Sequence, residues 1–336
     1  MTIWLLFGGA ALASLLLTGL FRRYALARSL MDVPNERSSH SVPTPRGGGL
    51  SIVICFLVAL PYLVLSFDIS WSHIWSLLGA GALVTLVGFL DDHGHIAARW
   101  RLLSHFAAAV FGVSFLSGIP SIDFLGSVYS FGWLGYVFFV LYLVWLLNLY
   151  NFMDGIDGIA SVEAVCVCFG VCLIYWILGD VGLIGAPLLL ATSVLGFLYW
   201  NFPPARIFMG DAGSGFLGIT MGLLSLQAAL VSPHFFWVWL ILLGVFIVDA
   251  TLTLLVRMLR GDKVYEAHRS HAYQFASRQV GAHLPVTLVV MVINLLWLLP
   301  IAICVGLLGL DGIIGVTIAY IPLIFIAYKF RAGRKE

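Results

Sequence analysis

The chain has 336 residues, of which 61% are hydrophobic and 10% are charged, and its formal net charge is +1 at pH 7. Soluble domains carry about 25% charged residues, so this composition excludes an ordinary water-soluble protein. It also argues against a nucleic-acid partner, because no basic domain is present to neutralise phosphates. The 5 cysteines all lie in apolar stretches, where packing is the expected role.

The sequence divides into about 11 apolar stretches that are each long enough to cross a bilayer, since about 20 helical residues span ~30 Å of hydrocarbon. We therefore predict an all-α protein: one polytopic transmembrane helical bundle that forms a single domain, residues 1–336. We also expect a short interfacial helix between residues 258 and 283. The predicted spans are residues 2–20, 49–67, 73–90, 102–119, 131–149, 159–178, 182–200, 213–232, 235–257, 284–307 and 312–329.

The basic residues fall on one side of these spans. All 17 Lys and Arg residues lie in or beside the odd-numbered connectors or in the C-terminal tail, and the even-numbered connectors contain none. By the positive-inside rule the basic side is cytosolic, which puts the N-terminus outside and the C-terminus inside. We therefore expect an active site that faces the cytosol and is formed by loops 21–48, 91–101, 148–158, 201–215 and 258–283.

Two adjacent carboxylates, Asp91 and Asp92, end the third predicted span. They stand at the pole of the helix dipole where a cation is preferred, so their placement needs compensation. A bound divalent cation would supply it, as would Arg99 or Arg101 on the next turns. A solvated helix end is the structural alternative.

Polar residues recur every three positions from the end of the fifth predicted span, at Asn148, Asn151, Asp154 and Asp157. On a continuous helix this spacing predicts one polar stripe. The two asparagines could instead cap carbonyls or join helices. Two carboxylates and two amides on one stripe favour a functional site.

Loop 201–215 contains Asn201, Phe208 and an aspartate between glycines, Asp211, just before an apolar helix. Asp211 could cap that helix. A glycine-flanked helix start is also suited to hold phosphate or a metal–phosphate pair. In the first loop, Arg46 precedes three glycines that let backbone amides approach a ligand, although a plain connector remains the alternative.

The last inner loop holds His268, Arg269 and His271. A His-x-x-His zinc pair would need a third ligand, and none is evident nearby. The three side chains together indicate an anion clamp.

These clusters place 5 carboxylates, two asparagines, histidines and arginines at one predicted membrane face. Mg²⁺ prefers oxygen ligands shared between one or two carboxylates and substrate phosphates. The set predicts a Mg²⁺-dependent phosphoryl-transfer site, with Mn²⁺ as the alternative ion. A membrane transporter of a small anionic solute is the competing hypothesis, although it would place ionisable groups near the bilayer midplane. Only Asp249, within the ninth predicted span, is so placed, and either a substrate role or a buried polar pair fits it.

The order of these motifs resembles the polyprenyl-phosphate N-acetylhexosamine-1-phosphate transferases, the superfamily of MraY and WecA. The resemblance covers nearly the whole chain and is most specific in the Asn148–Gly158 stretch and in Phe208-Met209-Gly210-Asp211. It implies transfer of a sugar-1-phosphate from a UDP-amino sugar to undecaprenyl phosphate, with release of UMP. It also implies a multi-pass protein of the bacterial inner membrane, in contact with membrane lipid, for which a homodimer is one expected assembly.

The resemblance also implies roles for individual residues. Asp211 would be a Mg²⁺ ligand, with Asp91, Asp92 and Asp154 beside it. Asn201, Phe208 and Asp157 match positions that hold the uridine, and His268, Arg269 and His271 match the loop that contacts donor phosphates or sugar. Asn148, Asn151 and Arg46 complete the expected substrate-binding set.

Two departures from the family pattern stand out. Ser270 stands before His271 where adjacent histidines are common, and His95 stands where the Asp-Asp-x-x-Lys/Arg element has its cation. The motifs of residues 34–40 and 268–274 are most similar to the WbpL-like branch that starts O-antigen repeats. That branch implies a 6-deoxy N-acetyl sugar such as N-acetylfucosamine, with UDP-GlcNAc as the alternative donor.

An aspartate base, Asp91 or Asp92, is usually proposed for this family. A phosphate monoester has a second pKa near about 6, so the attacking lipid phosphate is already mostly ionised at neutral pH. We therefore predict that Asp91 and Asp92 mainly position the metal and the acceptor.

Overall fold

A computed structural model describes residues 2–34, 39–40, 42–67, 69–94, 96–262 and 268–334. Residues 35–38 of the first-loop motif, and His95, where the family cation is missing, lie outside the described residues. Within the described ranges the protein is an all-α bundle with two short hairpins, as the hydropathy pattern predicts.

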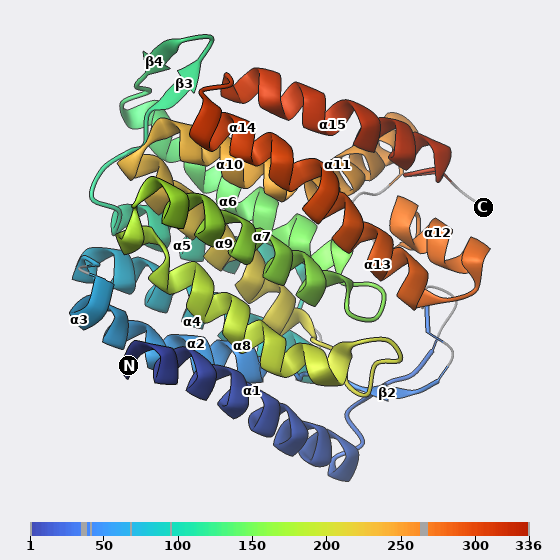
Figure 1. Ribbon diagram of the computed structural model, residues 1–336. Coiled ribbons are helices and arrows are strands. Elements are labelled where there is room, and N and C mark those ends of the chain that lie inside the picture. The colour runs from blue at the N-terminus through green and yellow to red at the C-terminus, as the bar shows by residue number, and fades with distance from the viewer. Residues whose placement is uncertain are drawn as a thin grey trace.

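The helices lie side by side in one bundle (Figure 1). The hairpin of β3 (Ile122–Phe124) and β4 (Ser127–Tyr129) stands at one end, and the short helix α12 (Ala272–Val280) and β2 (Thr44–Pro45) stand at the other. The remaining elements are α1 (Thr2–Ala27), β1 (Met31–Asp32), α2 (Leu50–Ala59), η1 (Leu60–Leu63), α3 (Val64–Phe67), α4 (Trp71–Gly94), α5 (Ala98–Ser114), α6 (Trp133–Met153), α7 (Ile159–Leu178), η2 (Val181–Leu183), α8 (Gly185–Asn201), α9 (Asp211–Val231), α10 (Pro233–Leu242), α11 (Gly244–Leu259), α13 (His283–Ile293), η3 (Asn294–Leu298), α14 (Leu299–Leu308) and α15 (Gly312–Lys329).

Of the described helices, 9 are long and apolar enough to cross a membrane. The pair α10 and α11 passes the same test together but is bent by 71°, so the predicted span 235–257 is broken. The predicted span 102–119 falls on α5, whose 17 residues make a helix of only about 25 Å. The polytopic fold is thus confirmed. Against the prediction of about 11 spans, 9 helices of the described residues qualify by length and composition, or 10 if the bent pair is one span.

The termini lie at opposite ends of the bundle (Figure 1). An odd number of crossings requires this arrangement. The prediction that the end with α12 faces the cytosol follows from the basic residues and stays a prediction.

Helix α9 is the centre of the bundle, since every residue from Ala212 to Ala229 is buried. Two glycines let neighbouring helices approach its backbone. A Cβ on Gly88 of α4 would lie 2.6 Å from the Cα of Ala212, and one on Gly218 of α9 would lie 2.7 Å from the Cα of Leu147 in α6. Because such contacts are too short for any side chain, these glycines bring α4 and α6 directly against the start of α9.

The first loop is tied to this centre by backbone hydrogen bonds. β1 pairs antiparallel with β2, with Met31 opposite Pro45. The chain then runs alongside residues 208–209: the Phe208 N–H donates to the Pro45 carbonyl at 2.8 Å, and the Gly48 N–H donates to the Phe208 carbonyl at 2.9 Å. Residues 45–48 therefore lie beside the start of α9, although they are far from it in sequence.

Candidate active site

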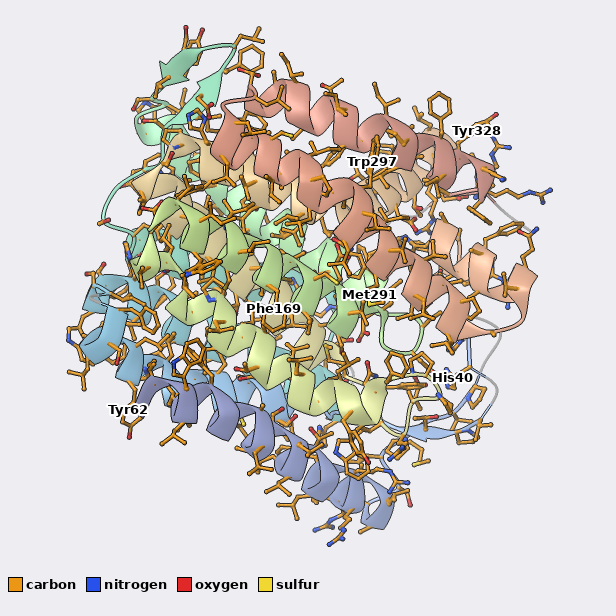
Figure 2. The ribbon with its side chains drawn as sticks, viewed as in Figure 1. His40, Tyr62, Phe169, Met291, Trp297 and Tyr328 are labelled. Atoms are coloured by element: carbon orange, nitrogen blue, oxygen red, sulfur yellow. The ribbon has the colours of Figure 1, made fainter. Side chains whose placement is uncertain are left out.

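A cavity of about 400 Å³ opens at the end of the bundle that carries α12. His40, one of its lining residues, lies at this end, and Tyr62 lies at the opposite end (Figure 2). Most residues that the sequence analysis selected meet here: Arg46, Asp92, Asn151, Asp154, Asp157, Asn201, Phe208, Asp211 and His268.

Four selected residues do not line this cavity: Asp91, Asn148, Arg269 and His271. Five residues with polar or charged side chains line it without having been selected: Asp32, Ser39, His40, Gln274 and His283. Ser39, His40 and Gln274 belong to motifs that carried the resemblance, and His283 is a polar residue at the start of a span. Membership of these motifs, and for His283 a polar side chain at the start of a span, could have identified the residues from the sequence.

Asp92 at the end of α4 caps α9. Its Oδ1 accepts from the Asp211 N–H at 3.3 Å and its Oδ2 from the Ala212 N–H at 3.4 Å. The residue before Asp211, Gly210, has φ of +80°, and a Cβ there would lie 2.7 Å from Asp92 Oδ2. Asp92 thus satisfies two of the free amides at a helix N-terminus and fixes the position of Asp211.

Asp91 is bound to an arginine. Its Oδ2 accepts from Arg101 Nη1 at 2.6 Å, and its Oδ1 accepts from the Ile96 N–H at 2.7 Å. The same Arg101 nitrogen lies 3.4 Å from Asp211 Oδ2. Arg101 on α5 is therefore the cation beside Asp91, and it links the end of α4 to the start of α9.

Asp154 ends α6 and lines the cavity. Burial, together with the nearby Asp211, Asp92 and Asp157, raises the pKa of Asp154 well above its ordinary value. No cation is within 4.0 Å of its carboxylate among the described residues. The charged form of this carboxyl is therefore costly in the protein alone, and a bound cation would stabilise it.

The donor set fits a hard divalent cation. Carboxylates are the ligands that Mg²⁺ prefers, and Asp154 and Asp211 face the same cavity. In the part of the chain that the structure describes, no group of three His, Cys, Asp or Glu side chains is spaced to hold a metal alone. Mg²⁺ commonly combines one or two carboxylates with substrate phosphates, so a site completed by a bound diphosphate agrees with this geometry.

The side chains of Asp157 and Asn201 form hydrogen bonds that fix the loops around the cavity. Asp157 Oδ2 accepts from the Ala205 N–H at 3.0 Å, and its Oδ1 lies 3.1 Å from His283 Nδ1. The other nitrogen of His283 lies 3.0 Å from the Ser39 carbonyl. Asn201 donates to the Ile207 carbonyl at 3.1 Å and accepts from Ser161 at 3.1 Å. Asp157 thus connects loop 201–215 to the first loop through His283, and Asn201 ties loop 201–215 to Ser161 of α7.

An aromatic pair separates this cavity from a second one. The rings of His40 and Phe208 meet edge to face, with centres 4.9 Å apart. Both residues also line the adjoining cavity of about 430 Å³, between Thr44, Pro204 and Ala282. The two cavities share one wall and together can receive a ligand with a ring at one end and charges at the other.

The histidine loop presents one ring to the cavity. Burial, with the nearby His271 and Arg257, lowers the pKa of His268 to about 3, so this ring is neutral at physiological pH. The Ser270 N–H donates to His268 Nδ1 at 3.3 Å, which leaves the proton on Nε2. His268 is therefore a neutral donor, and Ser270, the departure from the family pattern, orients it.

His271 lies behind this ring and not in the cavity. It is buried and stacks on His268 with ring centres 4.8 Å apart, and its Nδ1 lies 3.4 Å from Asp249 Oδ1. Asp249 accepts from the Ala272 and Tyr273 N–H groups at 2.9 and 3.0 Å. Of the two alternatives left open for Asp249, the buried polar pair is the one observed, and the pair caps α12.

Of the other selected residues, some form hydrogen bonds within or between helices and some line the cavity. Asn151 accepts from Ser214 at 2.6 Å and so ties α6 to the first turn of α9. Asn148 donates to the Val144 carbonyl at 2.7 Å, as the helix-bonding alternative expects. Arg46 lines the cavity and donates to the Asp92 carbonyl. The Arg269 carbonyl accepts from Arg278 at 3.1 Å.

Comparison with known proteins gives consistent matches. Residues 74–229 match the family described as glycosyl transferase family 4. A Bacillus subtilis protein named "Probable undecaprenyl-phosphate N-acetylglucosaminyl 1-phosphate transferase" is 30% identical, over 78% of this chain and 74% of its own. A decaprenyl-phosphate N-acetylglucosaminephosphotransferase of Mycobacterium leprae is 30% identical, over 66% of this chain and 60% of its own. A phospho-N-acetylmuramoyl-pentapeptide-transferase of Chlamydia muridarum is 35% identical, over 61% of this chain and 66% of its own.

Proposed function

The chain belongs to glycosyl transferase family 4, and from this premise we propose that it transfers an N-acetylamino-sugar 1-phosphate from a UDP-sugar to a polyprenyl phosphate. The observation that carries the proposal is that Asp154 and Asp211 line the same cavity, while no cation lies within 4.0 Å of Asp154 among the described residues. A divalent cation that enters with a nucleotide diphosphate would supply the positive charge that these carboxylates lack. The named relatives act on polyprenyl phosphates of the same kind.

The donor fits along the two adjoining cavities. The ring of Phe208, held by His40, offers a platform for the uracil base in the second cavity. The diphosphate then lies in the first cavity, where Asp211 and Asp154 would hold Mg²⁺ and Arg46 and His268 contribute donors. Asp157 and Asn201, which the resemblance assigns to the uridine, support this pocket through the loops that they close.

The reaction forms a bond between a lipid phosphate oxygen and the β-phosphorus of the donor, and it breaks the bridging P–O bond so that UMP leaves. When bound, Mg²⁺ neutralises the diphosphate and stabilises the leaving phosphate. Arg46 and neutral His268 orient the donor oxygens. Asp92 holds the start of α9 in place and Asp91 holds Arg101, so both act by position.

We propose UDP-N-acetylfucosamine or UDP-GlcNAc as the donor and undecaprenyl phosphate as the acceptor, with a role in starting O-antigen or another envelope polysaccharide. The first sugar comes from the WbpL-like motifs of the sequence. The second is the sugar named for the relatives of Bacillus subtilis and Mycobacterium leprae. The site lies on the cytosolic face of a bacterial inner membrane. UDP-sugars are made in the cytosol and reach it from that side.

The test uses membranes that contain the protein, a panel of UDP-sugars and undecaprenyl phosphate, with or without Mg²⁺. Release of UMP together with a lipid-linked sugar diphosphate, both dependent on Mg²⁺, is the expected result, and the panel identifies the sugar. Uptake of solute into vesicles without UMP release would instead favour the transporter hypothesis and overturn the proposal.

A further inference from the structure

A separate cavity of about 380 Å³ lies at the C-terminal end of α8, outside the donor cavities. It is lined by Leu198, Tyr199, Phe202, Pro203, Pro204 and Arg206. None of these described lining residues carries a carboxylate, and of them only Pro203 and Pro204 also line the second donor cavity.

The neighbouring indole ring of Trp200 is held rigidly against α1. Its Nε1 donates to the Leu15 carbonyl at 2.9 Å. A Cβ on Gly19 would lie 3.1 Å from the ring, so the glycine lets Trp200 pack closely on the helix. The ring is therefore a fixed platform between α1 and α8.

Two guanidinium groups converge on this platform. The Cζ atoms of Arg22 and Arg206 lie 5.9 and 5.6 Å from the centre of the Trp200 ring. Arg22 Nε also donates to the Arg206 carbonyl at 3.1 Å, and Arg206 lies 5.2 Å from the Tyr199 ring. Within the described ranges, neither arginine has a carboxylate within 4.0 Å.

Two cations held near one ring without a counter-charge repel each other, and an anion between them removes that cost. Arginine binds phosphate through parallel N–H donors, and its attraction to the ring face leaves those donors free at the edge. The charge and the geometry of this cluster therefore select a phosphate group.

The surroundings place that phosphate at a lipid surface. Helix α1 exposes a row of leucines along its length, Leu5, Leu12, Leu16 and Leu20, and then reaches Arg22. Tyr199 and Phe202, beside the cavity, are 59% and 42% exposed, as is typical of aromatic residues at the membrane–water boundary. Exposed leucines on α1, together with paired cations and aromatic rings near its C-terminal end, match acyl chains that lie close to an anionic head group.

We propose that Arg22 and Arg206, fixed by Trp200, bind the phosphate of an anionic phospholipid head group. The occupant does not react, because no carboxylate of the donor cavity reaches this site and the shared wall consists of two prolines. The inference does not depend on the proposed enzymatic function.

The test is retention of phosphatidylglycerol by the purified full-length protein, measured by native mass spectrometry after exchange into detergent, with phosphatidylcholine as the neutral lipid. Each arginine is expected to contribute on the order of fivefold to affinity, so Arg206→Gln should weaken phosphatidylglycerol binding about fivefold and the double variant Arg22→Gln/Arg206→Gln about 25-fold. Phosphatidylcholine binding should not change. Equal phosphatidylglycerol binding by the wild type and the double variant would overturn the proposal.

Arg334→Gln is the matched control, because Arg334 lies 4.6 Å from the exposed ring of Tyr328 near the other terminus and should leave lipid binding unchanged. Arg206 is exposed, so the single variant keeps the proposal testable if the double variant does not fold. An added arm uses undecaprenyl phosphate. If that lipid, and not phosphatidylglycerol, is lost on Arg206→Gln, the cluster is an acceptor site and the proposal is wrong.

Discussion

The carboxylate of Asp92 caps the helix that begins with Asp211, although the two residues belong to different spans: its oxygens accept from the Asp211 and Ala212 N–H groups at 3.3 and 3.4 Å. Asp249 does the same for α12, 2.9 and 3.0 Å from the Ala272 and Tyr273 N–H groups. In both cases an acidic side chain from one helix satisfies the free amides of another. The start of α9, with Asp211, is thus positioned by Asp92. The start of α12, which follows the histidine loop, is positioned by Asp249. Neither acid needs to touch the substrate for this role.

The first prediction concerns Asp92. Asp92→Ala should lower the free energy of unfolding by about 1 kcal/mol, the usual value of a lost N-cap, and lower activity because the start of α9 moves. Asp92→Asn keeps one acceptor oxygen and should lose less. If Asp91 and Asp92 act only by position, as we propose, the pH profile of kcat should keep its shape in Asp91→Asn and Asp92→Asn. Recovery of rate in either variant as pH rises well above 7 would establish a general base instead.

The second prediction concerns Arg101, which lies 2.6 Å from Asp91 and 3.4 Å from Asp211. Arg101→Gln leaves both carboxylates without this cation, so activity should fall by about 100-fold through misplacement of the site. The Mg²⁺ concentration for half-maximal activity should also fall, because the arginine no longer competes for Asp211. Arg99→Gln is the control, since Arg99 lies over Trp100 and should have little effect. Unchanged kinetics in Arg101→Gln would exclude this role.

The third prediction concerns the pair Asp157–His283, whose Oδ1 and Nδ1 atoms lie 3.1 Å apart. Each alanine variant should destabilise the protein, and the double variant should cost less than the sum, with a coupling of roughly 0.5–3 kcal/mol. Thermal unfolding of all four proteins measures this coupling. His234 at the other end of the bundle provides the control: His234→Ala combined with Asp157→Ala should be additive within about 0.5 kcal/mol. Additivity of the Asp157–His283 pair would mean that the loops are not held by this contact.

The fourth prediction concerns His268, whose pKa is lowered to about 3 in the folded protein. An unfolded chain titrates its histidines near pH ~6.5 and so binds more protons than the folded protein between these values. Stability should therefore fall as pH drops below about 6.5. His268→Asn removes this titration, so its unfolding temperature should drop less than that of the wild type between pH 7.5 and pH 5. An equal drop in both proteins would argue that His268 is not buried in this way.

The fold class follows from the sequence because a bilayer requires long apolar helices whose backbone groups are bonded internally. Asn151, Asp154 and Asp157 line one cavity, but α6 ends at Met153, so the polar stripe predicted for a continuous helix does not extend to Asp154 and Asp157. Hydropathy does not predict the 71° bend between α10 and α11, because the two helices together are apolar enough for one span and no proline stands at the break. It also does not show that α5 is short.

The site was predictable as a set of residues but not as a set of contacts. Asp91 and Asp92 are adjacent in sequence, yet one binds Arg101 and the other caps α9. Consecutive helical residues point in different directions, and their partners lie on other helices, so no local pattern separates the two roles. His283 was missed for the same reason, since its partners Asp157 and Ser39 belong to distant loops.

The central claim is that Asp154 and Asp211 hold a divalent cation together with the diphosphate of a UDP-sugar. The most direct measurement is Mn²⁺ binding to the purified protein by electron paramagnetic resonance, with and without UDP-GlcNAc or UDP. We predict that the nucleotide increases Mn²⁺ binding by the wild type and that Asp211→Asn removes this increase, while Arg334→Gln retains it. Mn²⁺ binding that is independent of the nucleotide, or that is unchanged in Asp211→Asn, would contradict the account.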